Sequence, residues 1–234
     1  MNSDRPVKEQ LPLSYAWRED LSFANFCGAR NAAAVQSLRA SAEGRGDQFV
    51  YLWGAPGTGK SHLLQAACQA AAERGMAVAY LSLDDSAALP LAALEGLEGL
   101  SLLCLDDLQA VVGEGPWEEA LFHLYNRLRD SGTVLLAAGD ASPAGLGVGL
   151  ADLRSRLGWG PVFRLQEPEE EEKVSALQAR ASTRGFDLPD EVAGYLIRRS
   201  PRDMTSLFAL LDRLDQASLA QQRRLTIPFV RDLI

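Results

Sequence analysis

Residues that hold metal ions or form disulfides are scarce in this chain. It has two histidines, His62 and His123, with no partner at ligand spacing, and three widely spaced cysteines, Cys27, Cys68 and Cys104. We therefore expect no metal site built from imidazoles. Reduced, buried thiols are expected in place of a disulfide framework.

Long hydrophobic runs are also missing. No apolar stretch approaches the length that crosses a bilayer, and the N-terminus, Met-Asn-Ser-Asp-Arg-Pro, lacks the apolar core of a signal peptide. We expect a cytoplasmic protein without membrane contact. Apolar residues still make up 47% of the 234 residues, which suffices for one large α/β domain with or without a small appendage.

Positively charged residues are fewer than negatively charged ones. The chain has 23 lysines and arginines against 31 acidic residues, a formal net charge of −8, which opposes broad adhesion to nucleic acid but leaves room for a local basic patch. The acidic run 169–172 could suggest a cation site. It follows Pro168 and begins a helical pattern, however, where the helix dipole stabilises negative charge, so we interpret it as a helix start.

What the chain does contain is a complete phosphate-binding P-loop. Residues 54–61 read Gly-Ala-Pro-Gly-Thr-Gly-Lys-Ser and directly follow the apolar run 49–53. A strand that ends in a glycine-rich turn and leads into a helix points N–H groups and the positive end of the helix dipole at phosphates. Lys60 would pair with the outer phosphates, and Ser61 would hold magnesium. The alternative is an ordinary glycine loop, but the strand-to-helix placement favours a nucleoside di- or triphosphate site that includes Gly54, Pro56, Gly57, Thr58, Gly59, Lys60, Ser61 and His62.

Apolar runs and helical patterns alternate through the first part of the chain. Strands are expected at 49–53, 78–83, 100–105, 134–138 and 162–165, and helices at 29–42, 60–74 and 117–129, with a variable leucine- and glycine-rich link before the third strand. Continuous apolar strands separated by helices predict an α/β fold, a parallel five-stranded sheet covered by helices on both faces.

The second part of the chain has helical patterns only. They cover roughly 169–184, 189–199, 203–222 and 228–234, with breaks at Gly185, Pro189, Pro201 and Pro228. Residues 1–20 are polar and proline-punctuated, as in a flexible tail. The predicted organisation is a tail (1–20), an α/β nucleotide-binding domain (21–167) and a small all-α domain (168–234).

Carboxylates follow two of the predicted strands. Asp106 and Asp107 end the third apolar run, at the edge of the sheet where ligands bind. Such residues are often solvated loop starters, but beside a P-loop Asp106 would hold magnesium through water and Asp107 would orient the attacking water. Asp140 follows the fourth strand and could touch the phosphate-bound water. The alternative for Asp140 is a turn former beside Ser142-Pro143.

Phosphoryl transfer also needs positive charge around the outer phosphate. Arg154 and Arg156 lie far from the P-loop in sequence, and we expect them on the domain surface. Arg202 begins a helix of the second domain, where it could fold over a nucleotide. By composition alone Arg154 and Arg156 are solubilising arginines, and Arg202 alone is unremarkable.

Together these motifs resemble the AAA+ ATPases of the bacterial DnaA family, and in particular its short members, the regulatory inactivation factors. Nearly the whole chain carries the resemblance: Ser22-Phe23-Ala24-Asn25-Phe26, the P-loop, Asp106-Asp107, 155–160 (Ser-Arg-Leu-Gly-Trp-Gly), Arg180-Ala181, 184–189 (Arg-Gly-Phe-Asp-Leu-Pro) and 225–230 (Leu-Thr-Ile-Pro-Phe-Val). Such coverage is more specific than a P-loop alone. The family fold is a sheet with the P-loop strand in the middle, followed by a helical lid.

The resemblance implies roles for individual residues. Arg156 stands at the position of the arginine finger, Arg202 at the second sensor in the lid and Asp140 at the first sensor. Phe23 and Phe26 would lie near the adenine. The implied cofactors are ADP or ATP with Mg²⁺, bound at a site whose own ATPase activity would be weak at most.

Both ends of the chain bear on its partners. The sequence stops at Ile234, after the predicted lid, so the helix-turn-helix domain with which the initiator reads DNA is not expected, nor is sequence-specific DNA binding. In the tail, Gln10, Leu11, Pro12 and Leu13 resemble a short form of the motif that binds the DNA polymerase III β sliding clamp. An unstructured tail can place two leucines in an apolar pocket while the Gln10 amide makes directed hydrogen bonds. An accidental match is the alternative.

The resulting hypothesis is a negative regulator of replication initiation. Bound to the DNA-loaded clamp, and thereby associated with the nucleoid, it would engage the ATP-bound initiator DnaA and supply Arg156 to the ATP of DnaA. The alternatives are a helicase loader, which should show a basic groove and a helicase-binding extension, and a self-sufficient ATPase. The oligomeric state is open, and a homo-oligomer is one possibility.

Overall fold

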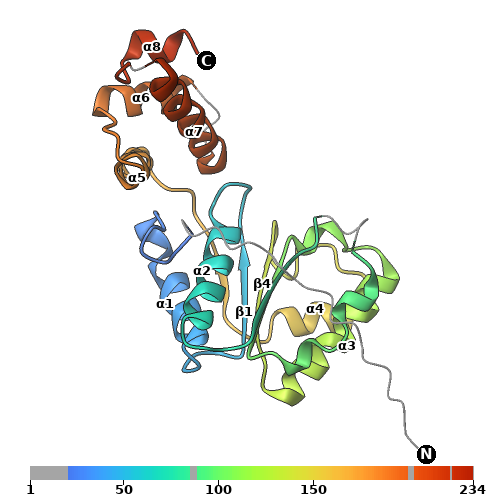
Figure 1. The fold of residues 1–234 in the computed structure, drawn as a ribbon. Helices are drawn as coiled ribbons and strands as arrows, with labels where there is room; N and C mark the ends of the chain where they lie inside the picture. The colour runs from blue at the N-terminus through green and yellow to red at the C-terminus, as the bar shows by residue number, and fades with distance from the viewer. Residues whose placement is uncertain (1–20, 85–88, 200–202, 222, 234) are drawn as a thin grey trace, which may run out of the picture.

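A computed structural model of the chain describes residues 21–84, 89–199, 203–221 and 223–233. Its five strands are parallel and lie in the order β2-β3-β4-β1-β5, which confirms the predicted sheet (Figure 1). The strands are β1 (Phe49–Trp53), β2 (Val78–Ser82), β3 (Leu102–Asp106), β4 (Val134–Gly139) and β5 (Val162–Arg164). The P-loop strand β1 is an interior strand, but it lies second from the edge and not in the middle.

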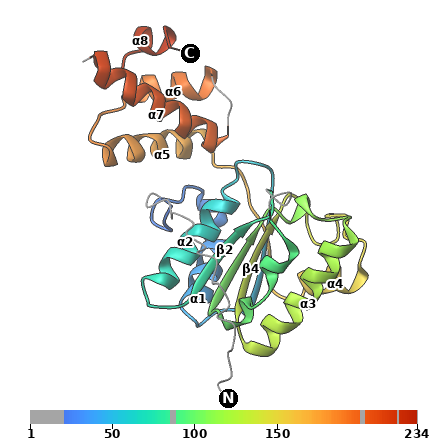
Figure 2. The same ribbon diagram turned by 45° about the vertical axis from the view of Figure 1, so that its right-hand side comes forward.

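Side chains alternate between two cores on opposite faces of the sheet. Within β1, Tyr51 packs into one core while Val50 and Leu52 pack into the other. The helices α1 (Ala32–Ala42) and α2 (Lys60–Ala72) cover the second core, and α3 (Gly115–Ser131) and α4 (Ala151–Leu157) cover the first (Figure 2). A strand buried on both faces needs a continuous apolar run, which is why the strands were predictable.

The structure differs from the sequence-based expectations at four places. A short 3₁₀ turn, η1 (Ala29–Asn31), precedes α1, where one continuous helix was expected. Helix α4 was not predicted; with one to two turns it is too short to show a helical period. The link before β3 forms two 3₁₀ turns, η2 (Leu91–Leu94) and η3 (Leu97–Gly99), and a third, η4 (Leu108–Ala110), follows β3.

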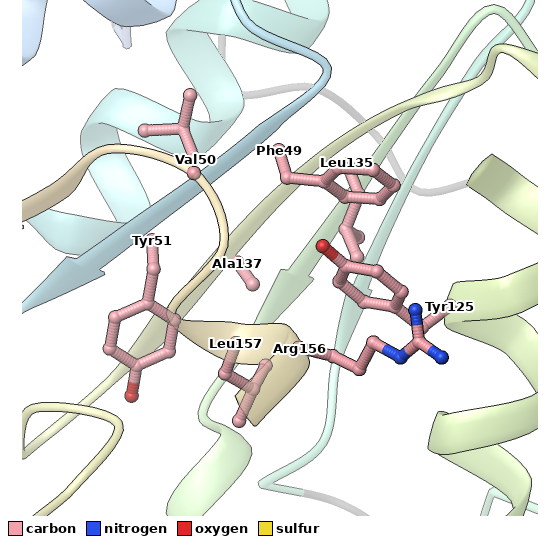
Figure 3. A pocket seen from close by; sticks show the side chains of 9 residues that line it. Phe49, Val50, Tyr51, Tyr125, Leu135, Ala137, Arg156 and Leu157 are labelled. Atoms are coloured by element: carbon pink, nitrogen blue, oxygen red, sulfur yellow. The ribbon is translucent and has the colours of Figure 1, made fainter. Parts of the chain in front are cut away.

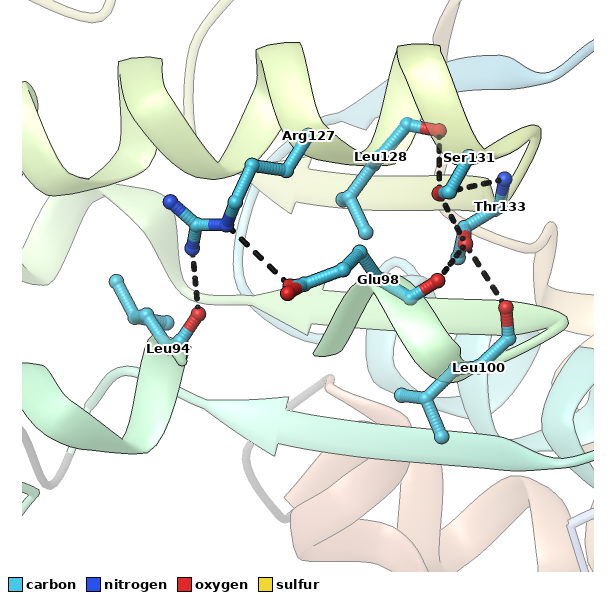
Figure 4. A network of polar contacts seen from close by, with 7 residues as sticks. All are labelled: Leu94, Glu98, Leu100, Arg127, Leu128, Ser131 and Thr133. Carbon is cyan, nitrogen blue, oxygen red and sulfur yellow. Dashed lines mark hydrogen bonds and ion pairs between the residues drawn. The ribbon is translucent and has the colours of Figure 1, made fainter. Parts of the chain in front are cut away.

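Polar contacts hold the link before β3 against the end of α3 (Figure 4). Arg127 donates to the Leu94 carbonyl at 2.8 Å and to the Glu98 carboxylate at 3.3 Å. The Thr133 hydroxyl donates to the carbonyl oxygens of Glu98 and Leu100 at 3.2 and 2.8 Å. The link is therefore fixed by side chains that satisfy its backbone acceptors.

The C-terminal helices form a separate core of their own. They are α5 (Glu170–Thr183), α6 (Asp190–Arg199), α7 (Met204–Gln221) and α8 (Ile227–Arg231). The acidic run begins α5 as interpreted: the Glu169 and Glu172 side chains and backbone N–H groups form a capping box. None of the helices in the described part of the chain is both long and apolar enough to span a membrane.

The junction between the two parts is a cluster of charged and polar contacts. Glu172 accepts a hydrogen bond from the Ala29 N–H at 2.7 Å. Arg30 lies 3.4 Å from the Glu169 carboxylate and donates to the Glu167 carbonyl at 2.9 Å. The acidic run thus ties the start of α5 to η1, the turn that precedes α1, in addition to capping α5.

Candidate functional site

The P-loop connects the carboxyl end of β1 to α2, on the side of the sheet that faces the helical part (Figure 1). Gly57 and Gly59 have φ angles of 80° and 94°, which side chains disfavour. A Cβ on Gly59 would lie 2.6 Å from the Phe26 ring, and one on Gly57 would lie 2.6 Å from Asp203 Cβ. Glycine is therefore required both by the backbone shape and by the close approach of two other segments.

Lys60 lies folded over this loop. Its ammonium group donates to the carbonyl oxygens of Gly54 and Ala55 at 2.8 and 3.2 Å. Burial lowers the pKa of Lys60, while the carboxylates of Asp106, Asp107 and Asp140 act in the opposite direction. Three acidic residues from two strand ends thus share one electrostatic environment with the P-loop lysine.

Asp106 is fully buried at the end of β3. Burial raises its pKa, an effect opposed by hydrogen bonds from the Ser61 hydroxyl, the Tyr80 hydroxyl and the Asp107 N–H. The contact with Ser61 brings together the two residues predicted to hold magnesium. A hydroxyl and a carboxylate are oxygen ligands of the kind that Mg²⁺ prefers.

Asp107 has an unusual backbone. Its φ of 59° makes it the one non-glycine residue with positive φ among those the structure describes. Ser82 and Gln109 donate to its two carboxylate oxygens at 3.1 and 2.9 Å, which hold the side chain in place. A left-handed backbone at a non-glycine residue costs about 1 kcal/mol or more and is often found at functional sites.

Asp140 follows β4 directly and is exposed. Its negative charge opposes the lowering of the Lys60 pKa by burial, and it adds to the raising of the Tyr51 pKa, which is mainly due to burial. Its expected contact with phosphate-bound water stays a prediction.

The two phenylalanines expected near the base lie in different places. Phe26 packs against Gly59 and meets His62 edge-on at a centroid distance of 5.5 Å. Phe23 lies instead under the Arg39 guanidinium, 5.3 Å away, in a groove lined by residues of α1 and α2. The structure therefore brings Phe26 and His62, but not Phe23, to the P-loop.

Cavities extend from the P-loop to the helical part. One is lined by Phe26, the glycines of the loop, Pro168, Met204 and Phe208. A neighbouring cavity of about 710 Å³ lies between residues 21–27, His62 and helices α5 and α7. The sequence did not point to Met204 and Phe208 as lining residues, because a helical pattern does not tell which face of α7 meets the P-loop. Asn25 and Cys27 also line the first of these cavities and were not predicted. The predicted residues Gln10, Leu11, Pro12, Leu13 and Arg202 lie outside the described residues.

These residues fit a nucleoside phosphate. The glycine loop has room only for backbone, Lys60 is held beside it, and Ser61 and Asp106 supply oxygen ligands. The adjoining cavity has the apolar and aromatic lining that suits a base. In the part of the chain that the structure describes, no cluster of three or more histidine, cysteine or acidic residues could hold a metal ion by itself.

Arg156 lies on the other face of the sheet, on α4. Its side chain points toward α3 and lies beside Tyr125, near Phe49 and Leu135 at the amino ends of β1 and β4 (Figure 3). It was expected on the surface but is half-buried. The helix that carries it is held by Glu118 of α3, whose buried carboxylate accepts N–H groups of Gly149 and Leu150 at 3.0 and 2.7 Å.

A P-loop on an interior strand of a parallel sheet, paired aspartates after a neighbouring strand and a helical lid over the loop define an AAA+ nucleotide-binding protein. Residues 18–164 match the model of the bacterial DnaA ATPase domain, and residues 170–234 match the model of the Hda lid domain. The chain belongs to the DnaA ATPase family, and its lid is of the Hda type.

Solved structures show the same fold. Domain III of the replication initiation protein DnaA from Thermotoga maritima matches with a TM-score of 0.81 and 23% identity, over 93% of this chain and 97% of that one. AMPPCP-bound DnaA from Aquifex aeolicus matches with a TM-score of 0.71 and 25% identity, over 86% of this chain and 66% of that one. The RuvB Holliday junction branch migration motor from Thermotoga maritima is more distant in sequence, at 20% identity and a TM-score of 0.70.

Proposed function

We propose that this protein is a DnaA-related regulator that restrains replication initiation by stimulating hydrolysis of the ATP bound to DnaA. Arg156 would act as the arginine finger, inserted in trans into the nucleotide site of the partner. A finger of this kind accelerates hydrolysis by about 10³- to 10⁵-fold, because it stabilises the charge of the transition state. The product would be inactive, ADP-bound DnaA.

The observation that carries this proposal is where Arg156 lies relative to the P-loop of the same chain. The P-loop follows the carboxyl end of β1, whereas Arg156 lies beside Phe49 at the amino end and on the opposite face from α2. The length of β1 alone separates the two by roughly 13 Å, at about 3.3 Å per residue. An arginine at this position is better placed to contact the nucleotide of a second molecule than the nucleotide of its own chain.

The nucleotide of the chain itself would have a structural role. The P-loop residues, Ser61 and Asp106 would bind ADP or ATP with Mg²⁺, which supplies charge neutralisation of the phosphates. Since the cavities beside the P-loop are lined by both parts of the chain, a nucleotide there would hold the lid in one arrangement. Asp107 and Asp140 would allow slow turnover at most.

The tail would recruit the protein to DNA by binding the sliding clamp. Gln10, Leu11, Pro12 and Leu13 would dock on the β sliding clamp loaded on DNA, which would confine the reaction to newly replicated DNA in the cytoplasm. Replacement of Gln10 and Leu11 by alanine should abolish clamp binding in a pull-down with purified clamp. Unchanged binding would place the clamp contact elsewhere in the chain.

The finger assignment is tested by a hydrolysis assay with labelled ATP on DnaA and loaded clamp. Arg156→Ala should remove the stimulation, whereas Arg154→Ala, an exposed arginine on the same helix, should leave it intact. Full stimulation by the Arg156 variant would show that the assignment is wrong. Brisk ATP turnover by the protein alone would favour a self-sufficient ATPase, and capture of a replicative helicase in place of DnaA would favour a helicase loader.

A further inference from the structure

Three aromatic rings surround the Arg156 guanidinium, and we call them the aromatic cage: Phe122, Tyr125 and Trp159. The central carbon of the guanidinium, Cζ of Arg156, lies 4.2 Å from the Trp159 ring centroid, 5.5 Å from that of Phe122 and 6.0 Å from that of Tyr125. The Tyr125 and Trp159 rings also meet edge-on, at a centroid distance of 6.1 Å. Two rings come from α3 and one from the turn after α4, so the cage spans the contact between these helices.

The cage binds the cation without neutralising it. Other arginines lie against carboxylates, such as Arg127 against Glu98 at 3.3 Å and Arg180 against Asp212 at 3.1 Å. Within the described ranges Arg156 makes no ion pair, and its buried Nη1 atom has no hydrogen-bond acceptor. Burial raises the pKa of Tyr125 to about 12 although Arg156 and Arg129 act to lower it, so the phenol stays neutral at physiological pH.

This arrangement differs in its energetics from an ion pair. An arginine paired with a carboxylate must lose that partner before it reaches a new anion, and any partner that is buried would then be left uncompensated. A guanidinium on aromatic faces is held more weakly, yet its side chain is confined to few rotamers. Its buried N–H without an acceptor would gain a hydrogen bond on moving to a phosphate oxygen.

We propose that the aromatic cage positions Arg156 for transfer to a phosphate group of a partner, with Trp159 as its principal element. Trp159 makes the shortest contact and is 55% exposed, so the cage is open to solvent on that side. This inference rests on the proposed function, in which that phosphate belongs to ATP on DnaA. Trp159 acts through Arg156 and is therefore a positioning residue.

The test is the stimulated hydrolysis of DnaA-bound ATP as a function of the concentration of this protein. Trp159→Ala should lower the maximal rate by roughly 2- to 30-fold, the range that corresponds to one cation–π contact, and leave the half-saturating concentration unchanged. Trp159→Phe should restore most of the rate, because a smaller aromatic face remains. Leu219→Ala, which removes another exposed apolar side chain far along α7, is the matched control and should behave like the unmodified protein.

The outcomes separate the two proposals. If Arg156→Ala still stimulates, the proposed function fails. If Arg156→Ala is inactive but Trp159→Ala keeps the full maximal rate, or changes only the half-saturating concentration, the cage does not position Arg156. Thermal unfolding midpoints of all variants show whether each is folded, and Trp159→Phe provides the comparison if the alanine variant is not.

Discussion

At the scale of single residues, the site depends on positions where a side chain satisfies neighbouring backbone groups. Glu118 is the clearest case: it is buried, and its carboxylate accepts N–H groups of Gly113, Gly149 and Leu150 at 2.8, 3.0 and 2.7 Å. Two of these donors directly precede α4. The carboxylate therefore determines where the helix that carries Arg156 begins.

Glu118→Gln should lower the free energy of unfolding by roughly 1–3 kcal/mol, because the amide nitrogen would face an N–H donor. Burial acts to raise the pKa of Glu118, but the three N–H groups lower it below the ordinary 4.5 overall. The carboxylate thus stabilises the fold fully above about pH 4.5, and this contribution is lost as the pH falls through the lower folded pKa. Urea unfolding at pH 7 and at pH 3 measures the difference, which should shrink at the lower pH.

The control for this variant is Glu119→Gln, whose carboxylate is exposed and lies 3.8 Å from His123. It should change the unfolding free energy by less than about 0.5 kcal/mol. Equal losses in the two variants would contradict the role given to Glu118.

Gly59→Ala should destabilise the P-loop beyond the ordinary cost of a positive φ. The added Cβ would meet the Phe26 ring at 2.6 Å, whereas a Cβ on Gly75, with a similar φ of 77°, would meet nothing within 4 Å. Gly75→Ala therefore measures the backbone term, about 1 kcal/mol, and the excess in Gly59→Ala measures the clash. We expect Gly59→Ala to lose more unfolding free energy than Gly75→Ala, measured by urea unfolding. We also expect it to bind nucleotide more weakly, measured by titration with a fluorescent nucleotide. No excess would mean that Phe26 does not pack on the loop.

At the scale of elements, the sequence predicted the helices and strands that have a clear hydrophobic period or a local motif. The apolar strands and the α2 start were found because burial on both faces and phosphate binding leave strong local patterns. Helix α4 was missed, since its seven residues are held by Glu118 from another element and not by their own period. The aromatic cage escaped prediction for the same reason: Phe122 and Trp159 are separated in sequence and meet only when α3 and α4 pack.

The contacts at the start of α5 are expected to hold the lid against the α/β part. Glu172 closes the capping box and also accepts from Ala29 N–H, contacts that hold its pKa below the ordinary value. Glu172→Ala should cost about 1 kcal/mol of stability and increase amide hydrogen exchange in the first turn of α5. Glu171→Ala, exposed on the same turn, is the control. Similar exchange in both variants would show that the junction does not depend on Glu172.

At the scale of the whole molecule, the α/β part and the lid meet around the P-loop. Phe26 packs on Gly59 from one side, and Asp203 at the start of α7 approaches Gly57 from the other. The sequence showed that two such parts exist, but their mutual contacts depend on side chains far apart in the chain. A nucleotide between them would therefore stabilise both parts together.

Added ADP should raise the unfolding midpoint and protect α5 and α7 from hydrogen exchange. At a concentration 100 times the Kd the stabilisation should be about 2.7 kcal/mol. Phe208→Ala, which removes a lid residue from the lining of both cavities, should reduce the gain, whereas Leu219→Ala should not. Protection of the P-loop without protection of the lid would contradict the coupling.

The central claim is that the hydrolysis occurs on the partner and not on this chain. It is tested most directly by loading DnaA with ATP that carries one γ-phosphate label and this protein with nucleotide that carries another, then mixing the two with DNA-loaded clamp. We expect rapid release of the label on DnaA while the label on this chain is retained, and no release from DnaA with Arg156→Ala. Rapid loss of the label on this chain, with that on DnaA retained, would contradict it.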